Sequence, residues 1–404
     1  MINRHEMIDL FSREEYLRRI NGLRSIMEQE DLHVLIFTEC SEEAYDQWLT
    51  GKRLLRYIIV PKQDEVIGVM WSEFDESGCS CGAEPDFSRY TIQKKPDPLC
   101  DGVRFVNCLS DEKLVSMFAT ERSVRVGVVQ PGRMTHSLSC ALHKQLPHGE
   151  LVDVTRPVSI FRSIKSEEEL SAIRNTRDVQ VRIFEALPQM LRVGRRMRDV
   201  NNELRHMLMS YGATGTLSAL VTNNGQGVIA LSENYGENDR VLAHGDTLFA
   251  LMEANSAGQQ HMAFGRHLVL GEPPEGMLST VQNSVKVHRF AASMFRPGET
   301  LANIAVATRK YANTLGYHLR EELGWNWMHS LGAFIYEQYA IEDIGETWPL
   351  QEGQVLHCHP MLYSYYNEGT RIIRKEVMVL NTYRVTQNGP EDLVNVPFDP
   401  IVIE

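Results

Sequence analysis

Hydrophobic residues recur every three or four positions near the start of the chain, a spacing that predicts an amphipathic helix. The apolar face of this helix is formed by Leu17, Ile20, Leu23 and Ile26. Short apolar runs at residues 33–38, 57–61 and 124–130 predict three strands further along. The pattern therefore predicts a mixed α/β unit over residues 1–160.

A helix-capping signal follows this first unit. Ser166 precedes Glu169 by three positions, the spacing of a capping box, in which the hydroxyl and the carboxylate each accept a hydrogen bond from a free backbone amide. The apolar positions after it predict the buried side of a long helix: Leu170, Ile173, Val181 and Phe184. Gly194 and Gly212 bracket a second helix. We therefore expect two domains, residues 1–160 and 161–404.

Strand-like runs dominate the pattern after residue 245. Residues 246–253 and 266–270 flank a polar turn that contains glycine, and they predict a hairpin. Two shorter strands are expected at residues 354–359 and 375–380. We expect residues 245–380 to form one continuous sheet with helices on one face, and to hold the functional pocket.

Composition limits the class of protein. Of 404 residues, 41 are Lys or Arg and 53 are Asp or Glu, so the formal net charge is −12, with a pI near 5.7. This balance argues against nucleic acid as a partner, because nucleic-acid binders usually carry a basic surface. No apolar run is long enough to span a membrane, and the acidic N-terminus does not resemble a signal peptide. We expect a cytoplasmic protein with no membrane partner.

Four residues in the second half carry side chains that can bind a metal ion or transfer protons near neutral pH. They are Glu253, His329, His359 and Glu376. A single histidine is more often a packed core residue, so none of the four identifies a site by itself. Their order and spacing are more specific, and we treat all four as candidate catalytic residues and as candidate ligands of a single metal ion.

The same order resembles the creatinase, prolidase and methionine-aminopeptidase superfamily. The segment Ala44-Tyr-Asp-Gln-Trp-Leu-Thr-Gly51 is similar to an element of the creatinase-type N-terminal domain, and residues 162–170 are similar to the segment that leads into the catalytic domain. His329-Ser-Leu-Gly-Ala-Phe-Ile-Tyr-Glu337 resembles the family's His-x-x-Gly-x-x-x-His-Glu motif. The resemblance implies an α+β fold, with a smaller α/β creatinase-type N-terminal domain at residues 1–160 and a pita-bread catalytic domain at residues 161–404.

The resemblance also shows which metal ligands differ. Peptidases of this family hold two metal ions with Asp, Asp, His, Glu and Glu, and here Glu253 falls at the first Asp position. Ala263 falls at the second Asp position, whose carboxylate bridges the two metals. His329 matches the ligand His, His359 falls at the first Glu and Glu376 matches the last. The resemblance therefore implies that a standard dinuclear peptidase site is missing.

Two further positions depart from the family pattern. Asn234 stands where the family usually has a histidine, and Tyr336 replaces the second His of the motif. Creatinase itself is similar in having Ala at the bridging position and in working without metal, but it keeps the upstream histidine as its proton shuttle. We place Asn234 and Tyr336 among the candidate substrate-binding residues.

The first functional hypothesis is a creatinase-like hydrolase that cleaves the C–N bond of an amide, amidine or guanidino substrate and is not a dinuclear peptidase. Glu376 or Glu253 acts in it as the acid/base, and His329 or His359 as the proton shuttle. The partner is then a small polar molecule that contains nitrogen.

Further side chains are candidates for binding this substrate. A guanidinium fork suits a carboxylate, so Arg266, Arg371 and Arg374 are candidate anchors. Trp327, two positions before His329, is a candidate wall of the pocket or a cation–π partner.

Two alternatives stay open. One keeps a single divalent ion, Fe, Mn or Zn, on His329, His359 and Glu376, with or without Glu253, and uses it in a lyase or hydrolase reaction. The other is a catalytically inactive, peptidase-like module that binds a protein or a peptide. The expected cofactor is accordingly none or one divalent metal ion. Resemblance to creatinase-type relatives implies a homodimer.

Overall fold

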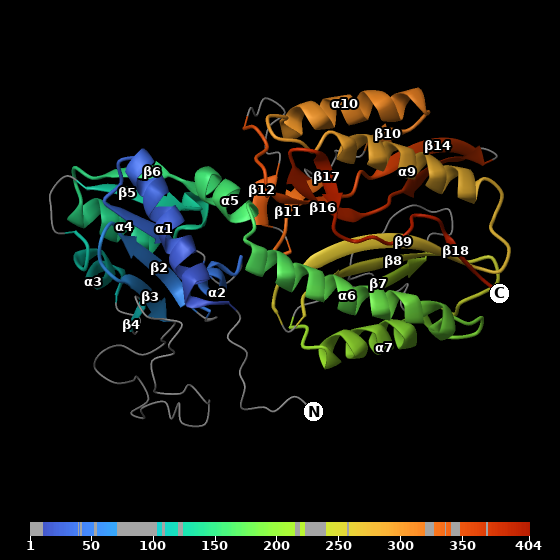
Figure 1. Ribbon diagram of the computed structural model, residues 1–404, viewed down its shortest axis with the longest axis horizontal. Helices are drawn as coiled ribbons and strands as arrows, with labels where there is room; N and C mark the ends of the chain where they lie inside the picture. The colour runs from blue at the N-terminus through green and yellow to red at the C-terminus, as the bar shows by residue number, and fades with distance from the viewer. Residues whose placement is uncertain are drawn as a thin grey trace. The chain divides into compact units, whose positions relative to one another are not determined.

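The computed structural model describes residues 11–38, 40, 43–51, 55–70, 103–106, 110–119, 124–214, 219–222, 240–256, 258–319, 327–335, 337–340, 348–368 and 371–404. The chain divides into two compact units, Met1–Arg162 and Ser163–Glu404 (Figure 1). Each unit has its own sheets and its own buried core. Within the described ranges, no helix is both long and apolar enough to cross a membrane.

The first unit is built on a mixed six-stranded sheet with the order β4-β3-β2-β1-β5-β6. Strand β1 lies inside the sheet and pairs antiparallel with β2 and parallel with β5. The three predicted strands are confirmed as β1, β2 and β5. The strands are β1 (Val34–Phe37), β2 (Leu55–Pro61), β3 (Val66–Met70), β4 (Val103–Val106), β5 (Arg125–Val129) and β6 (Glu150–Asp153).

The predicted N-terminal helix is confirmed as α1 (Arg13–Gln29), which the side chain of Ser12 caps. Its buried face differs from the prediction at one position, since Leu17 is 39 % exposed and Tyr16 is buried instead. The remaining helices of this unit are α2 (Tyr45–Thr50), α3 (Asp111–Ser116), the 3-10 helix η3 (Pro131–Arg133), α4 (His136–Gln145) and α5 (Thr155–Ser163).

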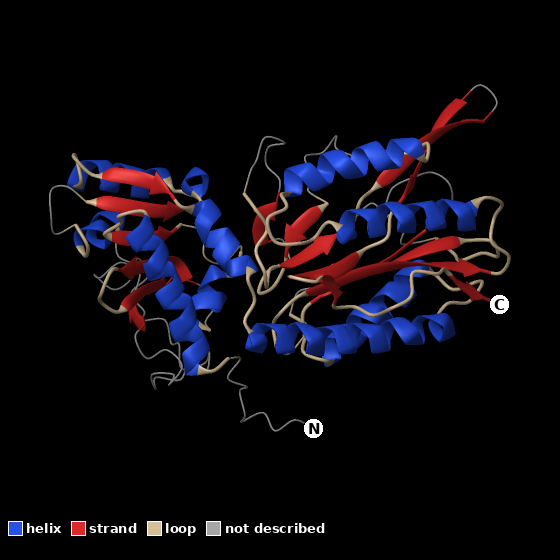
Figure 2. Ribbon diagram, turned by 45° about the horizontal axis from the view of Figure 1, so that its top comes forward, coloured by secondary structure: helices blue, strands red, loops and turns tan. Residues whose placement is uncertain are grey.

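The second unit begins with the two predicted helices, α6 (Glu167–Met190) and α7 (Met197–Ser210). The capping box is confirmed, because Ser166 Oγ accepts from the Glu169 amide and the Glu169 carboxylate accepts from the Ser166 amide. The apolar faces of both helices join one core cluster with a curved sheet behind them (Figure 2).

The predicted hairpin is confirmed as β8 (Thr247–Ala254) and β9 (Met262–Leu270), with Glu253 directly opposite Ala263. Both strands are buried along their whole length, as expected of strands covered on two faces. Strands β7 (Ala219–Thr222) and β18 (Ile401–Ile403) complete this four-stranded sheet, in the order β18-β9-β8-β7.

One continuous sheet over residues 245–380, with helices on one face, is a wrong prediction. The remaining strands form a five-stranded sheet, β12-β11-β13-β16-β17, and a three-stranded sheet, β10-β14-β15. The β8–β9 sheet meets the rest at an isolated bridge between Gly265 and Leu380. Helices α6 and α7 pack on β7, β8 and β9, whereas α9 (Met277–Ser293) and α10 (Leu301–Thr314) lie over the other sheets (Figure 1).

The bounds of the short strands differ from those predicted in one case. The prediction at residues 354–359 is confirmed as β13, but the strand expected at 375–380 ends earlier, because Leu380 turns to meet Gly265. The strands are β10 (His318–Leu319), β11 (Met328–Ser330), β12 (Glu337–Ala340), β13 (Val355–Cys358), β14 (Leu362–Glu368), β15 (Arg371–Val377), β16 (Asn381–Thr386) and β17 (Gly389–Asp392).

The fold predicts a pH dependence of stability through His288 on α9. This side chain is fully buried and its Nε2 lies 2.9 Å from Tyr383 Oη. Burial lowers the pKa of His288 to about 3, against 6.5 for an exposed imidazole. The folded state therefore favours the neutral ring, so this contribution to stability is complete above the unfolded pKa and decreases as the pH falls below it.

We expect His288→Gln to be less stable than the wild type near neutral pH but to lose less stability on acidification. Between about pH 8 and about pH 5, its free energy of unfolding should fall by about 2 kcal/mol less than that of the wild type. Urea unfolding at the two pH values measures this difference. Equal losses in both proteins contradict the prediction.

Candidate active site

The pairing of β11 with β13 brings two histidines face to face. The two strands are antiparallel, with His329 directly opposite His357. His359 lies two positions beyond His357, so both point to the same face of the strand. The backbone amide of His359 donates to Trp327 O at 2.8 Å, which extends the pairing past the end of β13.

These three buried rings form a cluster. Their centroids are 4.9 to 5.3 Å apart. Among the described residues, this is the one group of three or more His, Cys, Asp or Glu whose candidate ligand atoms all lie within 4.8 Å of one another. We call His329, His357 and His359 the histidine cluster.

Two of the rings are oriented by hydrogen bonds. His329 Nδ1 lies 3.0 Å from Ser330 O, and because a carbonyl oxygen only accepts, Nδ1 carries the proton of the neutral ring. Thr382 Oγ1 donates to Ala263 O at 2.7 Å, so its lone pairs accept from His357 Nδ1 at 3.3 Å. In both rings, Nε2 is therefore the nitrogen with the lone pair.

Burial keeps the cluster neutral near pH 7. It lowers the pKa of His329 to about 4. Burial together with the imidazoles of His359 and His329 holds the pKa of His357 well below its ordinary value, and burial and His329 have the same effect on the pKa of His359. Neutral imidazoles can accept protons or bind a borderline metal ion.

Glu253 lies beside this cluster. Its Oε1 atom is 3.7 Å from His357 Nε2, and both side chains are buried. Burial raises the pKa of Glu253 to about 8. The cross-strand partner of Glu253 is Ala263, whose methyl group offers no ligand atom. The second carboxylate of a dinuclear site is therefore missing at this point of the hairpin.

A buried ion pair holds the turn that follows His329. Lys165 Nζ lies 2.6 Å from Glu337 Oε2, and both side chains are almost completely buried. The Glu337 carboxylate also accepts from Ser330 Oγ at 3.2 Å and from the Ala333 amide at 3.1 Å. These bonds fix the backbone on which His329 and its acceptor Ser330 O are placed.

The predicted set of four ligands converges only in part. His329 and His359 lie together, with Glu253 beside His357, but Glu376 is not part of the histidine cluster. Glu376 lies on β15 opposite Tyr363 and is buried. The common site for His329, His359 and Glu376 therefore stays a prediction, and the structure adds His357, which cross-strand pairing places opposite His329.

The structure describes only some of the predicted substrate-binding residues. Trp327 is buried, and its carbonyl receives the amide of His359, so it lies next to the cluster. Asn234 and Tyr336 lie outside the described residues. Arg371 and Arg374 belong to β15, but their side chains lie outside the described part of the chain.

Arg266 contradicts its predicted role. Its guanidinium is fully buried and all five of its N–H groups donate within the protein. The acceptors are Gly265 O, Leu380 O, Asn381 Oδ1, Val396 O and Pro397 O. Its donors are already used by the chain, so Arg266 anchors the backbone where the sheets meet and has none left for a substrate carboxylate.

Sequence reasoning missed three contributors to the site: His357, Thr382 and Lys165. A signal existed for the first, because His357-Cys-His359 within a predicted strand places two imidazoles on one face. Thr382 and Lys165 carried no such signal. They reach the site through contacts with residues more than a hundred positions away, Thr382 with Ala263 and Lys165 with Glu337.

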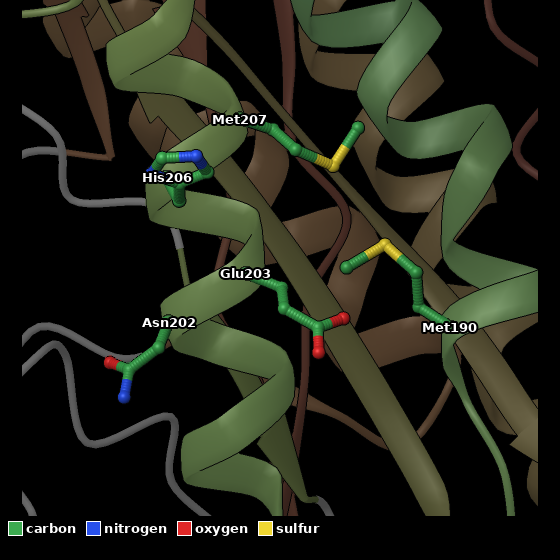
Figure 3. A pocket seen from close by; sticks show the side chains of 5 residues that line it. All are labelled: Met190, Asn202, Glu203, His206 and Met207. Atoms are coloured by element: carbon green, nitrogen blue, oxygen red, sulfur yellow. The ribbon is translucent and has the colours of Figure 1, made fainter.

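A separate hollow of about 400 Å³ lies on the surface of α6 and α7. Its lining consists of Met190, Asn202, Glu203, His206 and Met207, and the two thioethers face each other across it (Figure 3). None of the candidate site residues belongs to it. This hollow therefore plays no part in the candidate active site.

Known proteins resemble this chain over nearly its whole length. A model described as Metallopeptidase family M24 matches residues 171–386. A creatinase from Bacillus sp. (strain B-0618) is 24% identical over an alignment of 410 residues. The alignment covers 96% of this chain and 93% of the relative.

Solved structures share the fold. Dipeptidase PepE from Mycobacterium ulcerans gives a TM-score of 0.74 at 18% identity, covering 97% of this chain and 99% of that one. Xaa-Pro dipeptidase from Bacillus anthracis gives 0.71 at 17% identity, covering 96% and 99%. The predicted resemblance and the predicted α+β pita-bread fold are confirmed.

We expect Arg266→Met to reduce stability, because it leaves buried carbonyl groups without donors. The free energy of unfolding should fall by about 3 kcal/mol or more. Urea unfolding measures this loss, with Arg182→Met on the exposed face of α6 as a control that should stay within about 0.5 kcal/mol of the wild type. An Arg266→Met protein of unchanged stability would restore the substrate-binding interpretation.

Proposed function

Because the chain belongs to metallopeptidase family M24, a family of hydrolases, we propose that it hydrolyses the C–N bond of a small polar molecule. The substrate class is an amide, an amidine or a guanidino compound, and an ordinary dipeptide is not a substrate. The likeness to a creatinase over 96% of this chain supports this choice of substrate class.

The observation that carries the proposal is the pair Glu253 and Ala263. They lie opposite each other on β8 and β9, at the positions that match the first and the bridging aspartate of the peptidases. A bridging carboxylate is needed to hold two metal ions, and an alanine cannot supply it. Other groups that can transfer protons are retained: the histidine cluster with Glu253 beside it, and the buried Glu376 on β15.

Glu253 and the histidines are the groups proposed to transfer protons during hydrolysis. Water adds across the C–N bond, so its oxygen joins the carbon and a proton joins the leaving nitrogen. Glu253, buried beside His357, is the proposed acid/base. Without a bound metal, His359 is the proposed shuttle to the leaving nitrogen, whereas with the imidazoles bound to a metal Glu253 would carry both proton transfers. A divalent ion bound by the imidazoles would act as a Lewis acid on the water or on the substrate.

We expect turnover of small nitrogenous acids and none of dipeptides. Purified protein should be assayed with guanidino acids, cyclic amidines, primary amides and dipeptides, each with and without added divalent metal. Glu253→Gln should lower kcat at least about 100-fold, because it removes a proton-transfer group. Glu203→Gln, at an exposed site on α7, is the matched control and should retain full activity.

Two results would contradict the proposal. Robust release of the N-terminal residue from dipeptides would identify a peptidase. A folded protein that turns over no compound of the panel, yet binds a peptide or protein partner, would identify an inactive binding module.

The proposal includes a homodimer, as expected from the creatinase-type resemblance. Light scattering at micromolar concentration should then give twice the chain mass of 46.1 kDa. A mass equal to that of a single chain would reject this part of the proposal.

A further inference from the structure

We propose that His329, His357 and His359 bind one borderline divalent metal ion, such as zinc or iron, through imidazole nitrogens alone. The ion's open position would face Glu253. This inference deepens the proposed function by naming the cofactor of the same site, and it rests on that function only for the use made of the metal.

The backbone places the three ligands without help from a metal. His329 and His357 are cross-strand neighbours in the β11–β13 ladder, and His359 follows on the same face of the chain. Opposite residues in an antiparallel pair have Cβ atoms about 5 Å apart, a distance that imidazole rings can bridge. The ligand geometry is therefore a property of strand register.

The hydrogen bonds of the rings match those of metal-binding histidines. Such histidines usually donate the second ring N–H to a carbonyl, a carboxylate or another fixed acceptor, which sets the tautomer and the ring orientation. Here His329 Nδ1 is held by Ser330 O and His357 Nδ1 by Thr382 Oγ1. In both rings the proton is therefore on Nδ1 and the lone pair on Nε2.

The ring of His357 has a buried nitrogen to which no group of the described residues donates a hydrogen bond. Its Nε2 atom is buried and has no hydrogen-bond partner among the described residues, and the Glu253 oxygen at 3.7 Å is beyond hydrogen-bond range. A buried acceptor without a donor destabilises a fold. A cation bound at this point removes that cost.

The distances fit a single ion. Around a tetrahedral zinc ion the ligand nitrogens lie about 3.4 Å from one another, because each is about 2.1 Å from the metal. In the cluster they lie within 4.8 Å of one another. Small side-chain rotations that move each nitrogen by less than about 1 Å would bring the nitrogens from this separation to the one around zinc.

The donor set differs from the dinuclear set of the family and selects a different metal chemistry. Imidazoles suit zinc, iron, copper and nickel, whereas carboxylate-rich sites also suit manganese and magnesium. With Ala263 opposite Glu253, the cluster offers three neutral ligands and one adjacent carboxyl group. That composition fits a mononuclear centre with one position open.

The test measures metal content and metal affinity directly. Protein without an affinity tag, purified without added metal, should contain about one zinc or iron ion per chain by mass spectrometry. After removal of the metal with a chelator, Zn²⁺ should raise the temperature of unfolding, and Co²⁺ should give the visible spectrum of a tetrahedral site. His357→Gln should lose the metal and both responses.

Four variants separate this site from the other arrangements. Glu376→Gln should keep the metal, since Glu376 is not in the cluster. His267→Gln removes an equally buried imidazole, which binds Met378 O, and should keep it as well. Thr382→Val should weaken Zn²⁺ binding about ten- to hundred-fold, and Thr382→Ser should restore it. The threonine pair gives the answer if His357→Gln does not fold.

The proposal is overturned if the wild-type apoprotein responds to none of Zn²⁺, Co²⁺, Fe²⁺ and Mn²⁺. It is also overturned if folded His357→Gln or Thr382→Val binds Zn²⁺ as tightly as the wild type. Loss of metal from Glu376→Gln but not from His357→Gln would identify the other ligand set. Stoichiometric metal without turnover of the substrate panel would reject the proposed function and leave the metal site intact, whereas turnover without metal would do the reverse.

Discussion

The register of β11 against β13 is the constraint on which the site depends. With His329 opposite His357, every second residue of β13 faces the same side, and His359 joins the pair. A shift of one residue would turn His357 and His359 to the other face and bring Cys358 into the cluster. The Lys165–Glu337 ion pair and the Thr382 hydroxyl both act on this arrangement, the first by fixing the turn after β11 and the second by orienting a ring.

Local patterns predicted the elements well, and long-range packing decided the rest. The capping box at Ser166 and the β8–β9 hairpin, in which Ala263 faces Glu253, each depend on residues close in sequence. Both are confirmed. The division into three sheets, two of which meet at the bridge between Gly265 and Leu380, depends on long-range packing that no local pattern encodes. Arg266 was misassigned for the same reason, because its acceptors lie up to 131 positions away.

The sequence pointed to two histidines of the cluster and to the carboxyl group beside it, but not to His357, which links them. Family order identified Glu253, His329 and His359, and the structure groups them around His357. Glu376 matched the family pattern equally well, and it is buried on β15, a strand of a different sheet. Sequence alignment assigns a residue to a position, whereas the distance between two ligand atoms depends on how separate sheets curve and pack.

The anchoring of Arg266 also bears on how the chain folds as it is synthesised. Strands β8 and β9 are complete once residue 270 has been made. The guanidinium of Arg266, however, donates hydrogen bonds to the carbonyl oxygens of residues 380, 396 and 397. Strand β18 then pairs with β9 through residues 401–403. Until those residues emerge, a buried charge lacks its acceptors and one edge of the β9 strand is open. Such contacts of high sequence separation are slow to form, so this edge of β9 can be paired correctly only after the C-terminal strand has been made.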